Sequence, residues 1–187
     1  MNQPNNQSHY ISARVLKINV GFILAEGPGY SRDVHLDIPE RVQVAEDLFV
    51  ERLSGLLRLT RTSEGVLLQG TINTVRLAQC TRCLEDVAVT LDFEIEELYA
   101  TKLGTSTQFM IGENAILELA PLLREEIMIN TPGQIYCRED CQGLCPTCGK
   151  NLNYGPCDCK PEDIDPRWSA LMNLQKKLTD GDDKKRN

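Results

Sequence analysis

The sequence lacks the marks of several large protein classes. No apolar run reaches the roughly 18 residues of a membrane-spanning helix, and the opening residues MNQPNNQSHY carry neither an apolar run nor a basic start. There is no GxxxxGK[ST] phosphate loop, and no hydrolase or transferase constellation surrounds the two histidines, His9 and His35. We therefore expect a cytoplasmic protein that is not an enzyme, with no membrane partner and no small-molecule substrate.

Positive charge is also scarce, since 20 basic residues face 27 acidic ones and the net charge is −7. This balance argues against a protein that coats nucleic acid by bulk attraction. The charge is unevenly spread. The arginine-rich stretch 52–82 holds one acid, Glu64, whereas the stretch 85–126 is rich in acids and has two basic residues, Lys102 and Arg124. The two stretches could meet an RNA or a basic ribosomal protein, or they could be solvated surface.

The apolar pattern predicts an α+β fold, with an antiparallel β-sheet or partly open barrel and a few helices. Residues 53–62 and 66–80 are rich in Leu, Val, Ile and Thr, and the SEG between them predicts a hairpin turn in which Gly65 can take positive φ. Residues 87–97 alternate as a third strand. Helical spacing predicts a helix from about Ala120, with Pro121 in its first turn. Residues 11–26 fit a strand, a helix or one of each.

These patterns divide the chain into five parts. We expect a disordered N-terminus at 1–10, an α+β core domain at 11–136, a Cys-rich zinc module at 137–161, a C-terminal helix at 162–178 capped by Asp165, and a disordered tail at 179–187. The Cys-rich module has no periodic core pattern. It therefore needs a metal or a host surface to adopt one structure.

The chain has 8 cysteines, and in a reducing compartment their spacing favours metal binding over disulfides. Cys145 and Cys148 have the C-x2-C spacing of a zinc knuckle, and Gly149 permits the left-handed residue that ends such a turn. Cys157 and Cys159 could complete a tetrahedral site within the same segment. A zinc ligated by four sulfurs has no open position for water, so the site predicts structure and not catalysis.

The other four cysteines are Cys80, Cys83, Cys137 and Cys141. A second zinc shared by these residues would clip the Cys-rich module onto the sheet, so we expect two structural zinc ions. The alternative is one mixed site with spare cysteines. The C-x3-C-x2-C spacing of Cys141, Cys145 and Cys148 also suits the iron–sulfur cluster of a radical enzyme. Such enzymes carry it in an α/β barrel of more than ~200 residues, for which this chain has no room.

Four stretches, LAQCTRCLEDVAVTLDFEIEELY, LAPLLREEIMINTP, CREDCQGLCPTCGKNLNYGPCDC and IDPRWSALMNL, resemble the YceD family of bacterial and plastid proteins. The resemblance runs from about Leu53 to Leu178. Cys80, Arg82 and Cys83 match the family's central motif, and the remaining cysteines match the form that carries the full cysteine module. The family is associated with large-subunit ribosomal RNA accumulation and ribosome biogenesis. The resemblance therefore implies an assembly or RNA-stabilising factor.

Two functional hypotheses follow. The first is a zinc-stapled binding module that contacts large-subunit ribosomal RNA or a pre-ribosomal particle. Its phosphate-contact candidates are Arg58, Arg61, Arg76, Arg82, Lys150 and Lys160. The second is a redox-responsive zinc protein, in which oxidation ejects zinc and exposes an apolar surface for chaperone-like binding.

Overall fold

The computed structural model describes residues 10–102, 107–112 and 114–159, and the predicted C-terminal helix, tail and N-terminal segment 1–9 lie outside them. The chain divides into two compact units, Met1–Gly143 and Leu144–Asn187. The boundary falls inside the expected Cys-rich module, so Cys137 and Cys141 belong to the first unit. Among the described residues, no helix has the length and apolar character needed to cross a membrane.

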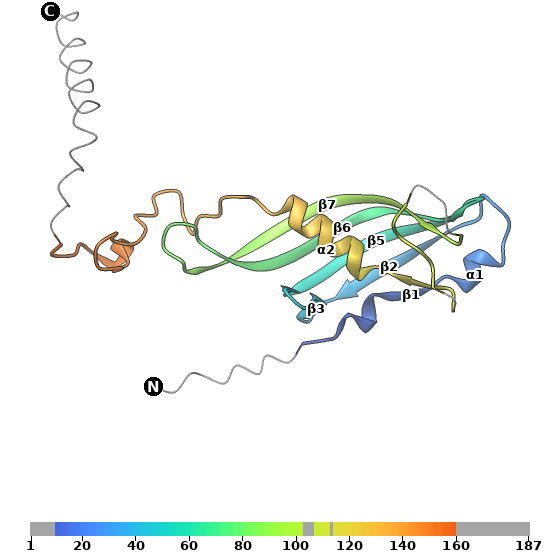
Figure 1. Ribbon diagram of the computed structural model, residues 1–187, viewed down its shortest axis with the longest axis horizontal. Helices are drawn as coiled ribbons and strands as arrows, with labels where there is room; N and C mark the ends of the chain where they lie inside the picture. Colours follow the sequence, from blue (N-terminus) through green and yellow to red (C-terminus); the bar gives the residue numbers. More distant parts are fainter. Residues whose placement is uncertain (1–9, 103–106, 113, 160–187) are drawn as a thin grey trace, which may run out of the picture. The chain divides into compact units, whose positions relative to one another are not determined.

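The first unit is built on an antiparallel sheet with strand order β2-β5-β6-β7 (Figure 1). Two short antiparallel ribbons, β1-β8 and β3-β4, accompany it. Its elements are η1 (Ala13–Leu16), β1 (Lys17–Asn19), α1 (Gly21–Leu24), β2 (Ser31–Ile38), β3 (Val42–Ala45), β4 (Leu48–Val50), β5 (Arg52–Arg61), β6 (Gly65–Gln79), β7 (Asp86–Ala100), β8 (Ile116–Glu118) and α2 (Ala120–Asn130). The α+β class with antiparallel sheet is confirmed.

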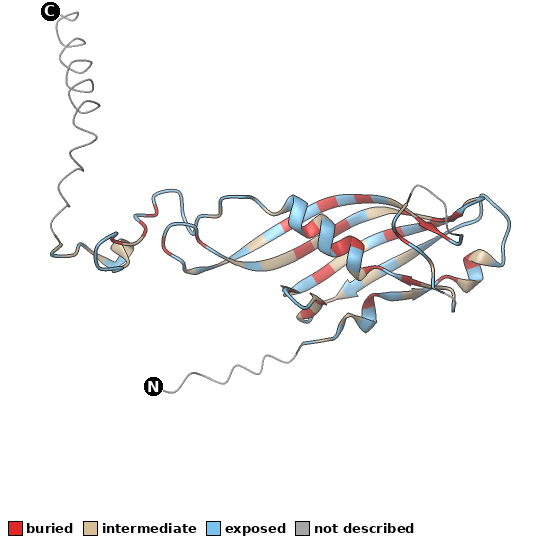
Figure 2. Cartoon of the chain, viewed as in Figure 1, coloured by how far each residue is buried: buried red, intermediate tan, exposed pale blue. Residues whose placement is uncertain are grey.

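The core lies between one face of this sheet and α2, and the red bands of buried residues in Figure 2 follow these elements. Strand β7 buries Leu91, Phe93 and Ile95, because every second side chain of a strand points to the same face. Helix α2 buries Leu123 and Ile127 at helical spacing, with Pro121 in its first turn. The predicted helix start and the predicted alternation of the strand are confirmed.

One local expectation needs correction, and one short strand was not expected. Gly65 does not take positive φ; it is the first residue of β6. A Cβ at this position would lie 1.9 Å from the carbonyl oxygen of Tyr99, so glycine is required because β6 and β7 approach closely here. Residues 116–118, just before the predicted helix, form β8 and pair with β1. A three-residue strand is too short to show a period of its own, so only tertiary pairing reveals it.

Candidate metal centres

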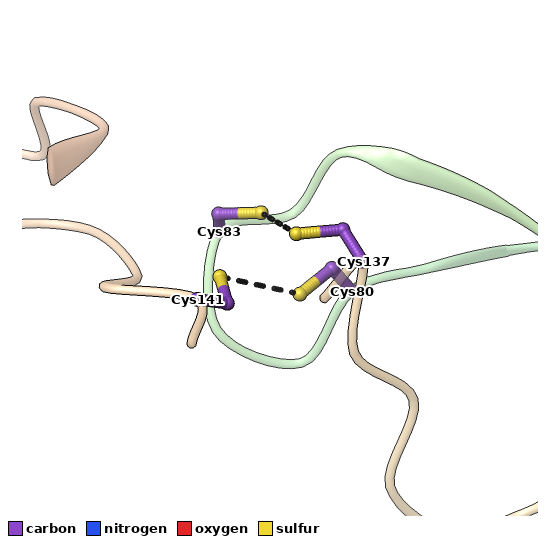
Figure 3. Close-up of side chains that lie close together, drawn as sticks. All are labelled: Cys80, Cys83, Cys137 and Cys141. Carbon is purple, nitrogen blue, oxygen red and sulfur yellow. Dashed lines mark hydrogen bonds between the residues drawn. The ribbon is translucent and has the colours of Figure 1, made fainter. Parts of the chain in front are cut away.

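The first cysteine cluster joins two distant parts of the first unit (Figure 3). Cys80 and Cys83 lie in the turn between β6 and β7, and Cys137 and Cys141 lie in the segment that follows α2. The Sγ atoms of Cys80 and Cys141 are 3.8 Å apart, and those of Cys83 and Cys137 are 3.6 Å apart. All four sulfurs lie within 4.8 Å of one another.

These separations fit one tetrahedral metal ion. Four sulfurs at a Zn–S distance of ~2.3 Å stand about 3.8 Å from one another, whereas a disulfide needs about 2.05 Å. Accordingly none of the eight cysteines, all of which the structure describes, forms a disulfide; in the first cluster Cys80, Cys83 and Cys141 are buried and Cys137 is exposed. An all-sulfur tetrahedral set is typical of zinc or iron, so the donor set suits a structural ion.

Turn residues hold this cluster together through contacts that need no metal. The amide of Thr81 donates to the carbonyl oxygen of Ile135 at 2.8 Å. The guanidinium of Arg82 donates to the carbonyl oxygen of Cys141 at 3.0 Å and lies 4.4 Å from the ring centre of Tyr136. The segment that supplies two of the four cysteines is therefore pinned to the turn on both sides.

The second cluster is contained in one short segment of the second unit. The Sγ atoms of Cys145, Cys148, Cys157 and Cys159 lie within 4.8 Å of one another. Between the two cysteine pairs, η2 (Leu152–Tyr154) and a bridge between Leu144 and Asn151 fold the loop back. Cys148 is exposed, and Cys157 and Cys159 are half-buried.

Both clusters use the same six-residue knuckle. The amide of Cys80 donates to Glu85 O at 2.8 Å and that of Leu84 to Cys80 O at 3.0 Å. In the second knuckle the amide of Cys145 donates to Lys150 O at 2.8 Å and that of Gly149 to Cys145 O at 2.9 Å. The fifth residue is left-handed in each, with φ of 61° at Leu84 and 71° at Gly149. The first knuckle is hard to recognise in the sequence, because its fifth residue is leucine, whereas a left-handed position favours glycine.

Backbone amides lower the pKa of one cysteine in each knuckle. Burial acts to raise the pKa of Cys80, but amides of Cys83, Arg82 and Cys137 outweigh it and lower the pKa to about 6. In the second knuckle, amides of Cys148 and Thr147 lower the pKa of Cys145 to about 6.

The neighbouring thiols respond in the opposite direction. The amide of Glu85 acts to lower the pKa of Cys83, but burial and the adjacent sulfurs outweigh it and raise the pKa to about 12. The sulfur of Cys148, together with burial, raises the pKa of Cys159 to about 12. Four thiolates can therefore coexist in either cluster only when a cation neutralises them.

Each of the predicted arginines makes a contact of its own within the first unit. Arg58 forms a two-pronged ion pair with Asp33. Arg61 donates to the carbonyl oxygens of Thr62 and Gly65 and so closes the turn between β5 and β6. Arg76 donates to Thr131 at the end of α2.

The predicted basic residues of the second unit divide between the described and undescribed parts. Lys150, the last residue of the second knuckle, donates to the carbonyl oxygen of Pro156 at 2.6 Å. Lys160 lies outside the described residues. RNA contact by any of the six basic residues stays a prediction.

A family model for the large ribosomal RNA subunit accumulation protein YceD matches residues 68–175. The chain belongs to this family. The uncharacterized protein Rv2926c of Mycobacterium tuberculosis is 28% identical over 182 residues, which cover 91% of this chain and 86% of that protein. The uncharacterized protein YlbN of Bacillus subtilis is 30% identical over 118 residues, covering 61% of this chain and 69% of that protein. No solved structure matches.

Proposed function

We propose that this protein is a non-enzymatic ribosome biogenesis factor that acts in the cytoplasm and supports accumulation or processing of large-subunit ribosomal RNA. Membership of the YceD family carries the proposal, because the family is named for accumulation of that RNA. Its partner would be the RNA itself, a pre-ribosomal particle or a ribosomal protein on that particle.

Two structural zinc ions would stabilise this factor. The first would be bound by Cys80, Cys83, Cys137 and Cys141, and the second by Cys145, Cys148, Cys157 and Cys159. Each quartet would fill the tetrahedral shell of its ion and would leave no position for water or substrate. This coordination supports a scaffold and not a catalyst.

The basic residues differ in their fitness to reach RNA. Arg61 and Arg76 are half-buried and bonded to groups of their own unit, so they are poorly placed for a phosphate contact. Arg58, Arg82 and Lys150 are exposed. We assign any phosphate contacts of the described residues to these three side chains, since an exposed guanidinium or ammonium can reach a phosphate without unfolding its surroundings.

The test is a strain in which the protein can be depleted and replaced. Depletion should lower mature large-subunit RNA relative to small-subunit RNA, and the wild-type protein should sediment with large-subunit precursors and restore the ratio. A matched pair of variants, Arg58→Glu and the exposed control Arg14→Glu, separates a local contact from a change in net charge without touching the contacts that hold the first cluster. An unchanged RNA ratio, with the protein only at the top of the gradient, would contradict the proposal.

The second candidate function, redox-responsive zinc release with chaperone-like binding, is favoured by one observation. Cys148 is exposed beside two half-buried cysteines, so peroxide can reach the second cluster. Under this function, mild peroxide should release one zinc per chain and create binding of an apolar fluorescent dye. Unchanged zinc and thiol content after that treatment would remove this candidate.

A further inference from the structure

Strand β7 is the outermost strand of the four-stranded sheet, with a neighbour in the sheet order only on its β6 side (Figure 1). The register with β6 is continuous from Gly65 opposite Ala100 to Gln79 opposite Asp86. The amide of Thr101 donates towards β6, to Glu64 O, whereas the amide of Ala100 donates away from it, to Phe109 O. Because the direction alternates along a strand, even-numbered residues of β7 point their amide and carbonyl groups at the open edge.

Part of this edge is already covered. Ala100 bonds to both Phe109 and Ile111, and the amide of Leu98 donates to the carboxylate of Glu97 at 3.2 Å. From Ala88 to Glu96, the edge-facing groups have no hydrogen-bond partner within the part of the chain that the structure describes. An uncovered stretch of this kind is a template for pairing with another strand.

The side chains along the uncovered stretch alternate strictly. Thr90, Asp92, Glu94 and Glu96 are exposed on the outer face of the sheet. On the inner face, Leu91, Phe93 and Ile95 are 3 to 6% exposed and form the margin of the core. A strand added at this edge would lay one row of side chains beside the acids and the other beside the apolar margin.

The charge of the edge limits what can pair there. Strand β7 contains no basic residue, and no ion pair within the described chain includes Asp92, Glu94 or Glu96. A second copy would set these acids against their own counterparts, which is unfavourable across a strand pair. RNA would likewise bring phosphates against carboxylates. A basic protein segment has the complementary charge.

We propose that the β7 edge from Ala88 to Glu96 binds an extended segment of a partner protein in which basic and apolar residues alternate. The segment adds a fifth strand to the sheet. Its backbone bonds to the even-numbered residues of β7, its basic side chains face Asp92, Glu94 and Glu96, and its apolar side chains extend the core beside Phe93. This inference rests on the proposed function for the partner's setting, and it names the partner as a basic protein segment.

The binding test uses a synthetic peptide of about nine alternating lysine and valine residues, long enough to cover the uncovered stretch at ~3.4 Å per residue. Two control peptides have glutamate in place of lysine, or the same composition without alternation. We expect saturable binding of the alternating peptide that weakens with salt, and at least tenfold weaker binding of both controls. Equal binding of the scrambled peptide would overturn strand addition.

Hydrogen exchange gives a readout that only edge pairing predicts. In the free protein, amides of odd-numbered residues such as Leu91 and Phe93 should exchange slowly, because they bond to β6, and those of Thr90, Asp92 and Glu94 should exchange fast. Bound peptide should slow the even-numbered amides. Binding that leaves them fast would place the peptide on another surface and overturn the proposal.

Two variants complete the test. Thr90→Pro removes an edge-facing donor without removing a bond to β6, and Thr90→Ala keeps that donor; only the proline should weaken peptide binding, about tenfold or more. Should Thr90→Pro unfold the sheet, the pair Glu94→Lys with Glu96→Lys tests the same edge through its charge. Its matched control, Glu40→Lys with Glu46→Lys, makes the same charge change at exposed positions flanking β3. Equal binding by both pairs would overturn the inference.

A photo-crosslinker at Thr90 in cells separates this inference from the proposed function. Adducts should map to a basic, alternating segment of a protein, and adducts to RNA or to a second copy would overturn the inference. If the protein sediments with large-subunit precursors but the pair Glu94→Lys with Glu96→Lys leaves both the crosslink from position 90 and the peptide affinity unchanged, the edge proposal fails and the function stands. If it never sediments with them but binds the peptide through the edge, the proposed function fails alone.

Discussion

The two cysteine clusters each contain a knuckle of the same conformation, but they connect different parts of the chain. The first brings together the β6–β7 turn and the segment after α2, more than fifty residues apart along the chain, as Cys83 and Cys137 show. The second draws all four cysteines from residues 145–159. A metal in the first cluster closes a long loop and supports the sheet, whereas a metal in the second organises only its own segment.

Removing one sulfur from each cluster should give the largest effect. Cys80→Ser and Cys157→Ser should each lower zinc content from two ions per chain to one. Only Cys80→Ser should lower the melting temperature of the sheet, by on the order of 10 °C, because it also frees the segment after α2. Metal analysis and thermal denaturation measure the two effects, and equal melting shifts would contradict the difference between the clusters.

Chelation should separate the clusters in time. Each cluster has one exposed cysteine, but the first buries Cys80, Cys83 and Cys141, whereas the second buries only Cys145. A colorimetric chelator should therefore remove the second zinc at least ~10-fold faster than the first. Alkylation followed by mass spectrometry identifies which cysteines are released in each phase. Release in a single phase, or first release from Cys80, would show that burial does not govern access.

The Arg82 contacts should matter less than the metal but should still be measurable. Arg82→Ala removes the bond to Cys141 O and the stacking on Tyr136, with an expected loss of about 1–2 kcal/mol in unfolding free energy. Arg82→Lys should recover little, since an ammonium lacks the planar fork that does both. Full recovery by lysine in denaturant titrations would mean that charge alone is needed.

Exchanging the fifth residues of the knuckles tests their shared conformation. Leu84→Gly should stabilise the first knuckle and Gly149→Ala should destabilise the second, each by about 1 kcal/mol, because a left-handed φ favours glycine. Leu84→Ala is the control that removes the side chain but keeps the backbone cost. Stabilisation by alanine as large as by glycine would attribute the effect to the exposed leucyl group.

The smallest effect should come from the surface ion pair of the sheet between Arg58 and Asp33. The hydrogen bond from Arg58 holds the pKa of Asp33 below its ordinary value of 3.8. The folded-state pKa is lowered, so the pair stabilises the protein above pH ~4 and loses its contribution as the pH falls through the folded-state pKa. Asp33→Asn should flatten this acid dependence slightly, without changing zinc content at neutral pH.

Much of the sheet could be predicted from the sequence because its strands are long. The hairpin of β5 and β6 and the alternation of β7 span enough residues for period and turn residues to agree. Strand β8 could not be found, since three residues show no period. The expectation of positive φ at Gly65 was wrong because glycine is required there by the close approach of Tyr99 on the neighbouring strand, and a contact between strands cannot be seen in the local sequence.

The second candidate metal site is similarly local, and the spacing of Cys145, Cys148, Cys157 and Cys159 along the chain is enough to favour it. The first site needed the fold. Spacing alone left open one mixed site with spare cysteines, because nothing in the sequence measures the distance between the β6–β7 turn and the segment after α2.

By itself, the sequence determined where strands alternate, where helix α2 begins and where a C-x2-C turn can present two sulfurs, because each of these depends on residues a few positions apart. Only the tertiary structure decided that CTRCLE is a knuckle equivalent to CPTCGK, since Leu84 takes a conformation that its residue type disfavours. It also decided that β7 is the open strand of the sheet. Strand order follows from contacts among distant segments, and no local pattern contains that information.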